Sequence, residues 1–240
     1  MNLLQANAER WNKCVINSSK ASLFTSVSNR LTNPSAISRY KSVEARTGVP
    51  WWFVAVVHER EASQKWTASI AQGDPWNKKS THVPAGRGPF KSWEDAAVDA
   101  LTNCAPYAAR NKDWSPAGAL TLLEEYNGLG YARKGRPSPY IWAGTNQYTS
   151  GKYVRDGVYN PNVVDEQLGC AGLLMTMGAF KSNTLRNTAS AGTLTGGLAT
   201  ATVAPHNYWP WIVGGTIVAS SVVWLYFHFK GKVNVNSNPY

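Results

Sequence analysis

The clearest indication of the fold comes from the apolar segment Pro50-Trp-Trp-Phe-Val-Ala-Val-Val-His-Glu-Arg-Glu-Ala-Ser63. It begins with proline, which suits the first turn of a helix because its φ is already near the helical value. An unbroken apolar run follows and ends in four consecutive ionisable residues, His58 to Glu61. We expect a helix over residues 50–61 whose carboxyl end is partly withdrawn from water.

Patterns on the carboxyl side of this stretch extend the interpretation to a mainly helical domain. Further helices are expected over residues 93–109, 115–126 and 162–180. The Gly- and Pro-rich segments 71–90 and 128–159 should form functional loops or short hairpins, since structureless connections of that length are uncommon. With 43% hydrophobic residues and 11 Trp, the chain has enough apolar surface for a core. We expect an α+β, mainly α, domain over residues 1–180.

The composition changes after residue 180. Residues 181–205 are rich in Ala, Thr, Gly and Ser without aromatics, which predicts a flexible linker. The 22 residues 208–229 contain no Asp, Glu, Lys or Arg, and as a helix they would measure about 33 Å, close to the ~30 Å hydrocarbon core of a bilayer. We therefore expect a transmembrane helix over residues 206–230 and a short tail over 231–240, with a buried core helix as the alternative.

Flanking charges predict how this span is oriented. Lys230 and Lys232 follow it directly, whereas the preceding side has no Lys or Arg back to Arg186. The positive-inside rule then places the tail in the cytoplasm and the large domain on the other side. The amino terminus lacks a basic segment followed by a long apolar run, so we expect no cleavable signal peptide.

The formal net charge of +10 favours an anionic partner, such as nucleic acid, a membrane surface or an acidic wall polymer. The basic residues are scattered and not interleaved with aromatics, so nucleic acid is not expected as the partner. The helix end lacks the second histidine of a zinc-binding helix, because position 62 is Ala. No metal or other cofactor is expected, and the three cysteines, which form no CxxC pair, should be buried thiols.

Glutamate side chains are better candidates for a catalytic role than a metal site or the cysteines. Glu59 and Glu61 lie at the end of a strongly apolar helix, where partial desolvation raises a carboxyl pKa toward the range that a general acid needs. They are about 200° apart around the helix axis, so they cannot share one site. Helical pattern alone does not choose between them, and either could instead be a solvated charge at the helix end.

Short motifs along residues 48–168 resemble those of lysozyme-like enzymes. The segment Ala55 to Ser63 is similar to the catalytic helix of goose-type lysozymes and lytic transglycosylases, and Glu125-Tyr-Asn-Gly-Leu-Gly-Tyr131 is similar to the Tyr-Asn-Ala-Gly motif that lines their saccharide cleft. A closer resemblance is to phage and prophage endolysins. It rests on Gly48-Val-Pro, His58-x-Arg60-Glu61, Gly73-Asp-Pro, Val83-Pro-x-Gly-Arg87-Gly-Pro-Phe90, Asn127-Gly-x-Gly-Tyr131, Ser138-Pro-Tyr-Ile-Trp-Ala-Gly-Thr-Asn146 and Lys152-Tyr-Val-x-Asp156-Gly.

The resemblance implies a lysozyme-like fold that cleaves peptidoglycan between N-acetylmuramic acid and N-acetylglucosamine during bacterial cell lysis, with Glu61 as general acid. Asp74 and Thr81 would position water. Substrate-binding residues would be His58, Arg60, Arg87, Tyr126, Asn127, Tyr131, Tyr140, Trp142, Asn146 and Tyr148, with core packing as the alternative for each aromatic. Ala62 replaces the family's Ser and no Gly-Leu-Met-Gln motif is present, so hydrolase and transglycosylase both stay open.

Two further functions compete with this one: a non-catalytic, membrane-anchored peptidoglycan-binding protein and a chitinase-like glycosidase. In the favoured interpretation the protein is a single-pass protein of the bacterial inner membrane whose catalytic domain ultimately faces the wall. Its partners are then peptidoglycan glycan strands and the lipid bilayer. Gly215 and Ala219, four apart, would allow weak self-association of the span.

The predicted span can be tested by fractionation. We expect the full-length protein to sediment with membranes and to resist carbonate extraction, because 22 uncharged residues partition into the hydrocarbon core. A chain that ends at Pro205 should be soluble and serves as the control. Full-length protein in the soluble fraction would contradict the membrane helix.

Overall fold

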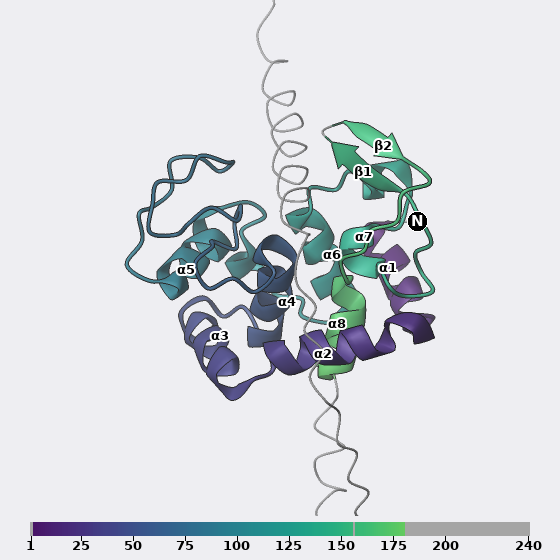
Figure 1. The fold of residues 1–240 in the computed structure, drawn as a ribbon, viewed down its shortest axis with the longest axis horizontal. Helices are drawn as coiled ribbons and strands as arrows, with labels where there is room; N and C mark the ends of the chain where they lie inside the picture. Colours follow the sequence, from purple (N-terminus) through teal and green to yellow (C-terminus); the bar gives the residue numbers. More distant parts are fainter. Residues whose placement is uncertain (1, 156, 181–240) are drawn as a thin grey trace, which may run out of the picture.

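The computed structural model describes residues 2–155 and 157–180. This part of the chain is mainly helical, with eight α-helices and one antiparallel two-stranded sheet (Figure 1). The α+β, mainly α, class is therefore confirmed. The predicted linker, transmembrane helix and tail at 181–240 lie outside the described residues, as do Gly215 and Ala219. Among the described residues, no helix is both long and apolar enough to cross a membrane.

The helix that the opening stretch predicts is α4, Trp51–Ala62, and it forms the centre of the fold. Pro50 stands at its amino end, and Ser63 ends it in the left-handed region at φ 49°. Every residue from Phe53 to Glu59 is buried. An amphipathic surface helix would bury only one stripe, so α4 packs against other elements on most of its circumference.

Three helices that were not predicted individually precede α4: α1 (Leu3–Asn12), α2 (Ala21–Leu31) and α3 (Pro34–Thr47). Helix α3 packs against both α4 and α5, and α2 packs against α8. The contact between α2 and α8 depends on Gly172, where an added Cβ would lie 2.3 Å from the Phe24 ring.

The four predicted helices are present, two of them shorter than expected. Helix α6 (Pro116–Tyr126) matches its prediction closely. Helix α5 (Trp93–Asn103) stops before Pro106, and a separate 3₁₀ turn follows at Ala108–Arg110. Helix α8 (Cys170–Met177) begins only after Gly169, so the expected start at residue 162 is wrong.

The two long loops were expected to be functional loops or short hairpins, and one contains a hairpin. Segment 128–159 carries the short helix α7 (Pro139–Trp142) and strand β1 (Lys152–Arg155), which pairs with β2 (Val158–Asn160). Segment 71–90 has no helix or regular strand. Of the three free thiols, Cys104 and Cys170 are buried and Cys14 is half-buried.

Figure 1 shows how these elements lie around α4. Helices α3 and α5 lie to one side of α4, while α6, α7 and the hairpin lie to the other, with α2 and α8 beneath. Helix α7 also packs against α6 and α8. Helix α4 is therefore packed against segments from distant parts of the sequence, α2, α3 and α8.

Candidate functional site

Glu61, in the last turn of α4, meets a side chain from α7. The Tyr140 hydroxyl donates a hydrogen bond of 2.8 Å to Glu61 Oε1. Tyr140 is 3% exposed, whereas Glu61 is only part-buried. The carboxyl is therefore oriented by a buried phenol but is not sealed inside the core.

The surroundings of Glu61 favour its protonated form. Burial raises the pKa of Glu61 to about 7, although the hydrogen bond from Tyr140 and the charge of Arg60 act in the opposite direction. Tyr126 also stands nearby, since burial and the negative charge of Glu61 both raise the pKa of this phenol. Its hydroxyl donates to the Ile70 carbonyl at 2.9 Å. The direct hydrogen-bond partner of Glu61 is thus a phenol, and the nearby charge of Arg60 does not outweigh the effect of burial.

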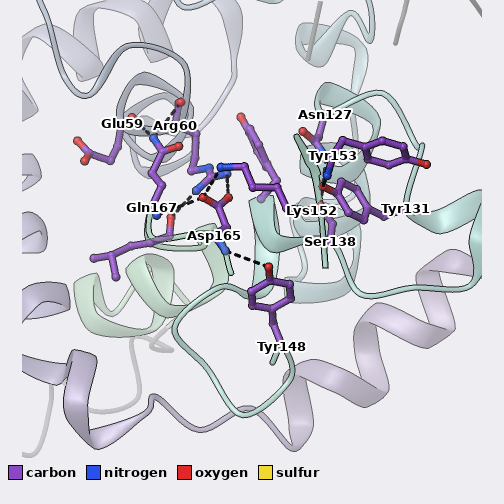
Figure 2. A network of polar contacts seen from close by, with 12 residues as sticks. Glu59, Arg60, Asn127, Tyr131, Ser138, Tyr148, Lys152, Tyr153, Asp165 and Gln167 are labelled. Carbon is purple, nitrogen blue, oxygen red and sulfur yellow. Dashed lines mark hydrogen bonds and ion pairs between the residues drawn. The ribbon is translucent and has the colours of Figure 1, made fainter. Parts of the chain in front are cut away.

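Arg60 is part of a buried network and not of an exposed binding surface. Its guanidinium forms an ion pair of 3.2 Å with Asp165, and the two side chains are only 6% and 4% exposed. Lys152, on β1, reaches the other Asp165 oxygen at 2.9 Å (Figure 2). The Arg60 guanidinium also lies 4.7 Å from the Tyr140 ring centre. Arg60 therefore lies under Tyr140, which in turn holds Glu61, and its expected role in substrate binding stays a prediction.

Glu59 has a different environment from Glu61. Its carboxylate forms an ion pair of 3.0 Å with Arg30 of α2, and the Glu59 side chain is 10% exposed. The Gln167 amide donates to the backbone carbonyls of both Glu59 and Arg60, as Figure 2 shows. Glu59 is thus held by a cation, whereas the direct partner of Glu61 is a neutral phenol.

His58 is fully buried. Its ring lies 4.6 Å from those of both Trp66 and Trp93, and its two nitrogens face the Tyr40 hydroxyl and the Lys65 carbonyl at 3.1 Å. Burial lowers the pKa of His58 to about 4, against the effect of the Lys65 hydrogen bond. His58 is thus a neutral residue of the core, and its expected role in substrate binding stays a prediction.

Asp74 organises the loop that it belongs to. One carboxylate oxygen accepts hydrogen bonds from the backbone N–H groups of Thr81 and His82, and the other lies 2.6 Å from the His82 ring. Burial acts to raise the pKa of Asp74, but these hydrogen bonds lower it below the usual value. In the described part of the chain, neither Asp74 nor Thr81 makes a polar contact with Glu61. Arg87, from the same loop, is ion-paired with Asp99 of α5.

Three of the predicted glycan-binding side chains serve the structure itself. Trp142 is 1% exposed and belongs to the core. The buried Tyr148 hydroxyl donates to the Gly151 carbonyl and accepts from the Asp165 backbone N–H at 3.0 Å (Figure 2). Asn146 is exposed and fastens its loop to the backbone of residues 13–15. The core-packing alternative therefore describes Trp142 and Tyr148.

Asn127 and Tyr131 lie beside the hairpin. The half-buried Asn127 amide donates to Ser138 Oγ at 3.1 Å, and Ser138 immediately precedes α7. The Tyr131 hydroxyl accepts the Tyr153 backbone N–H at 3.0 Å. Figure 2 shows both contacts next to Lys152. The structure thus brings Tyr126 and Tyr140 close to Glu61, and Asn127 lies at the start of α7 through Ser138.

A second perturbed carboxyl, Glu124 of α6, was not among the predicted site residues. It is 2% exposed, and burial raises its pKa to about 8 despite hydrogen bonds from Ser138 and the Ala132 backbone. Glu124 stands four residues after Leu120, and this helical spacing could have indicated that it lies on the buried face of α6. Because Ser138 also accepts from Asn127, Glu124 is linked to the Asn127 amide through one hydroxyl.

This arrangement can supply a proton near neutral pH from Glu61 at a partly open position. No described residue belongs to a cluster that could hold a metal ion. Comparison with known proteins finds no match among family models, curated proteins or solved structures. The chemistry of the site therefore rests on its own geometry.

The raised pKa of Glu61 predicts a pH-dependent stability. Between pH 4.5 and about 7 the folded protein keeps a proton that the unfolded chain releases, so the free energy of unfolding falls as pH rises through this window. We expect Glu61→Gln to remove this loss and to be more stable than wild type at pH 8, by on the order of 1–3 kcal/mol. Urea denaturation at pH 4.5 and pH 8 measures the difference.

Glu59→Gln is the matched control, because it makes the same change two residues away. It removes the ion pair with Arg30 and should be less stable than wild type at pH 8. Identical pH dependence in wild type and Glu61→Gln would contradict the raised pKa of Glu61.

Proposed function

We propose that this protein is a glycosidase that cleaves the glycan strand of peptidoglycan between N-acetylmuramic acid and N-acetylglucosamine. The observation that carries the proposal is the Glu61 carboxyl, whose pKa is raised to about 7 while Tyr140 fixes its direction. A general acid must hold its proton at working pH and still be able to release it, and this pKa meets both needs. The lysozyme-like motifs of the sequence point to the same residue and class of substrate.

In the proposed reaction Glu61 donates its proton to the glycosidic oxygen as the bond to the sugar breaks. Positive charge then develops on the sugar ring, as in other glycoside hydrolyses. Tyr140 stabilises the carboxylate that remains, since its hydroxyl already donates to Oε1. The supporting stack of Arg60 on Tyr140 limits movement of the phenol.

Two products are compatible with a single acid. Water that attacks the developing cation gives a reducing sugar, whereas attack by the 6-hydroxyl of the same muramic acid gives an anhydro product. Asp74 is hydrogen-bonded within its own loop. Protonation by Glu61 is common to both routes, so hydrolase and transglycosylase are two forms of the proposal.

The location of the enzyme is part of the proposal. A linker at 181–205 and a membrane helix at 206–230 would tether the domain of residues 1–180 to the inner membrane of a bacterium, with that domain finally on the wall side. The net charge of +10 supports contact with an anionic wall or membrane surface. Release of the enzyme to its substrate would then contribute to cell lysis.

The test is the loss of activity in Glu61→Gln. The amide is isosteric but delivers no proton, so we expect the rate of wall cleavage to fall by on the order of 10² or more. Wild-type activity should decline above pH about 7 as Glu61 loses its proton. The readouts are turbidity of a wall suspension and mass spectrometry of the released fragments, with full-length protein in a nonionic detergent.

Glu59→Gln serves again as the control and should keep most of its activity at temperatures where it is folded. Equal losses in the two variants would contradict the assignment of Glu61. A wild-type protein that binds walls without releasing fragments would instead support the non-catalytic binding protein, and cleavage of chitin oligomers alone would support the chitinase-like alternative.

A further inference from the structure

The hairpin and the turn before α7 are rich in positive charge. Residues 126–160 contain five Lys or Arg against a single acidic residue. Lys134 and Arg136 are both exposed, and neither takes part in an ion pair in the part of the chain that the structure describes.

These two cations rest on tyrosine rings instead. The Arg136 guanidinium lies 4.2 Å from the centre of the Tyr159 ring. The Lys134 ammonium lies 5.3 Å and 5.9 Å from the ring centres of Tyr153 and Tyr159. The rings of Tyr131, Tyr153 and Tyr159 pack edge to face, which fixes the platform under the cations.

A cation held by a ring differs from one held by a carboxylate. The ring restrains the position of Lys134 and Arg136 without neutralising their charge, so their N–H donors stay available to an anion. Pre-positioned donors lose less conformational entropy on binding than free surface side chains do. This cation–tyrosine surface, defined as Tyr131, Lys134, Arg136, Tyr153 and Tyr159, is therefore suited to an anionic ligand.

The surface is joined to the site around Glu61. The Tyr131 hydroxyl accepts the Tyr153 N–H, and Lys152, the residue before Tyr153, reaches Asp165. Asp165 pairs with Arg60, which precedes Glu61 in the chain (Figure 2). The cations are thus held in a fixed relation to the proposed acid by a chain of short polar contacts.

We infer that the cation–tyrosine surface binds the carboxylates of the peptide attached to the muramic acid, which makes the peptide-bearing glycan the preferred substrate. This inference rests on the proposed function. The peptide is covalently linked to the sugar at the cleaved bond, so its carboxylates accompany every productive encounter with Glu61. Phosphate groups of other wall polymers are not part of the repeating glycan and have no such fixed relation to that bond.

The experiment compares two double variants with wild type on two substrates. Lys134→Ala/Arg136→Ala removes the proposed anchors. Arg110→Ala/Lys112→Ala is the matched control, because it removes two exposed cations with the same spacing and Arg110 also lies over a tyrosine, Tyr107, at 4.3 Å. The substrates are peptidoglycan with intact peptides and the same glycan after an amidase has removed them.

We expect Lys134→Ala/Arg136→Ala to raise KM on peptide-bearing glycan by about tenfold with little change in kcat, which corresponds to about 1.4 kcal/mol. On peptide-free glycan it should stay within about twofold of wild type, and the control variant should do so on both substrates. Equal losses on the two glycans, or in the two variants, would overturn the inference.

A binding measurement separates this inference from the proposed reaction. Calorimetry with a soluble, uncleavable disaccharide-peptide should show binding to wild type that weakens about tenfold in Lys134→Ala/Arg136→Ala. Binding of this kind by a protein that cleaves no glycan would refute the glycosidase and retain the surface. Binding of teichoic acid or anionic vesicles but not of the disaccharide-peptide would overturn the peptide assignment.

Discussion

The buried ion pair between Arg60 and Asp165 is the interaction on which the site depends. A charge withdrawn from water is very costly unless it is paired and hydrogen-bonded, and both of these side chains are almost completely enclosed. The pair requires residue 165 to lie against the end of α4, which fastens the segment before α8 to the centre of the fold. Lys152 uses the second Asp165 oxygen, so the hairpin is fastened there as well.

The cost of burying a charge applies to all four ionisable residues at the end of α4. Successive side chains point about 100° apart around the helix, so each of the four meets a different neighbour. His58 is held neutral among aromatic rings, Glu59 is paired with Arg30, and Arg60 is paired with Asp165. Glu61 differs from these three because its direct partner is the neutral hydroxyl of Tyr140 and its position is partly open. Burial therefore dominates its pKa, and a proton is retained where a reacting group could take it.

The hydrophobic pattern of the sequence predicted the positions of helices, which depend mainly on residues close together in the chain. The apolar run after Pro50 and the pattern of residues 115–126 located α4 and α6 well, since both helices bury most of their surface. Helix α3 had available signals in the Asn33 cap and the left-handed Gly48, but its polar composition hid them. The partners of Arg60 and Glu59 come from Asp165 and Arg30, far away in the chain, and no spacing rule predicts such pairs. For the same reason the aromatic motif residues could not be divided in advance into core and surface.

The central claim is that Glu61 keeps a proton near neutral pH, and a direct titration tests it. Infrared difference spectra between wild type and Glu61→Gln, recorded across pH 4 to 9, isolate the protonated carboxyl of this one residue from that of Glu124. We expect a carboxyl band that disappears with a midpoint at about pH 7. A midpoint near 4.5, the ordinary value for a glutamate, would contradict this claim.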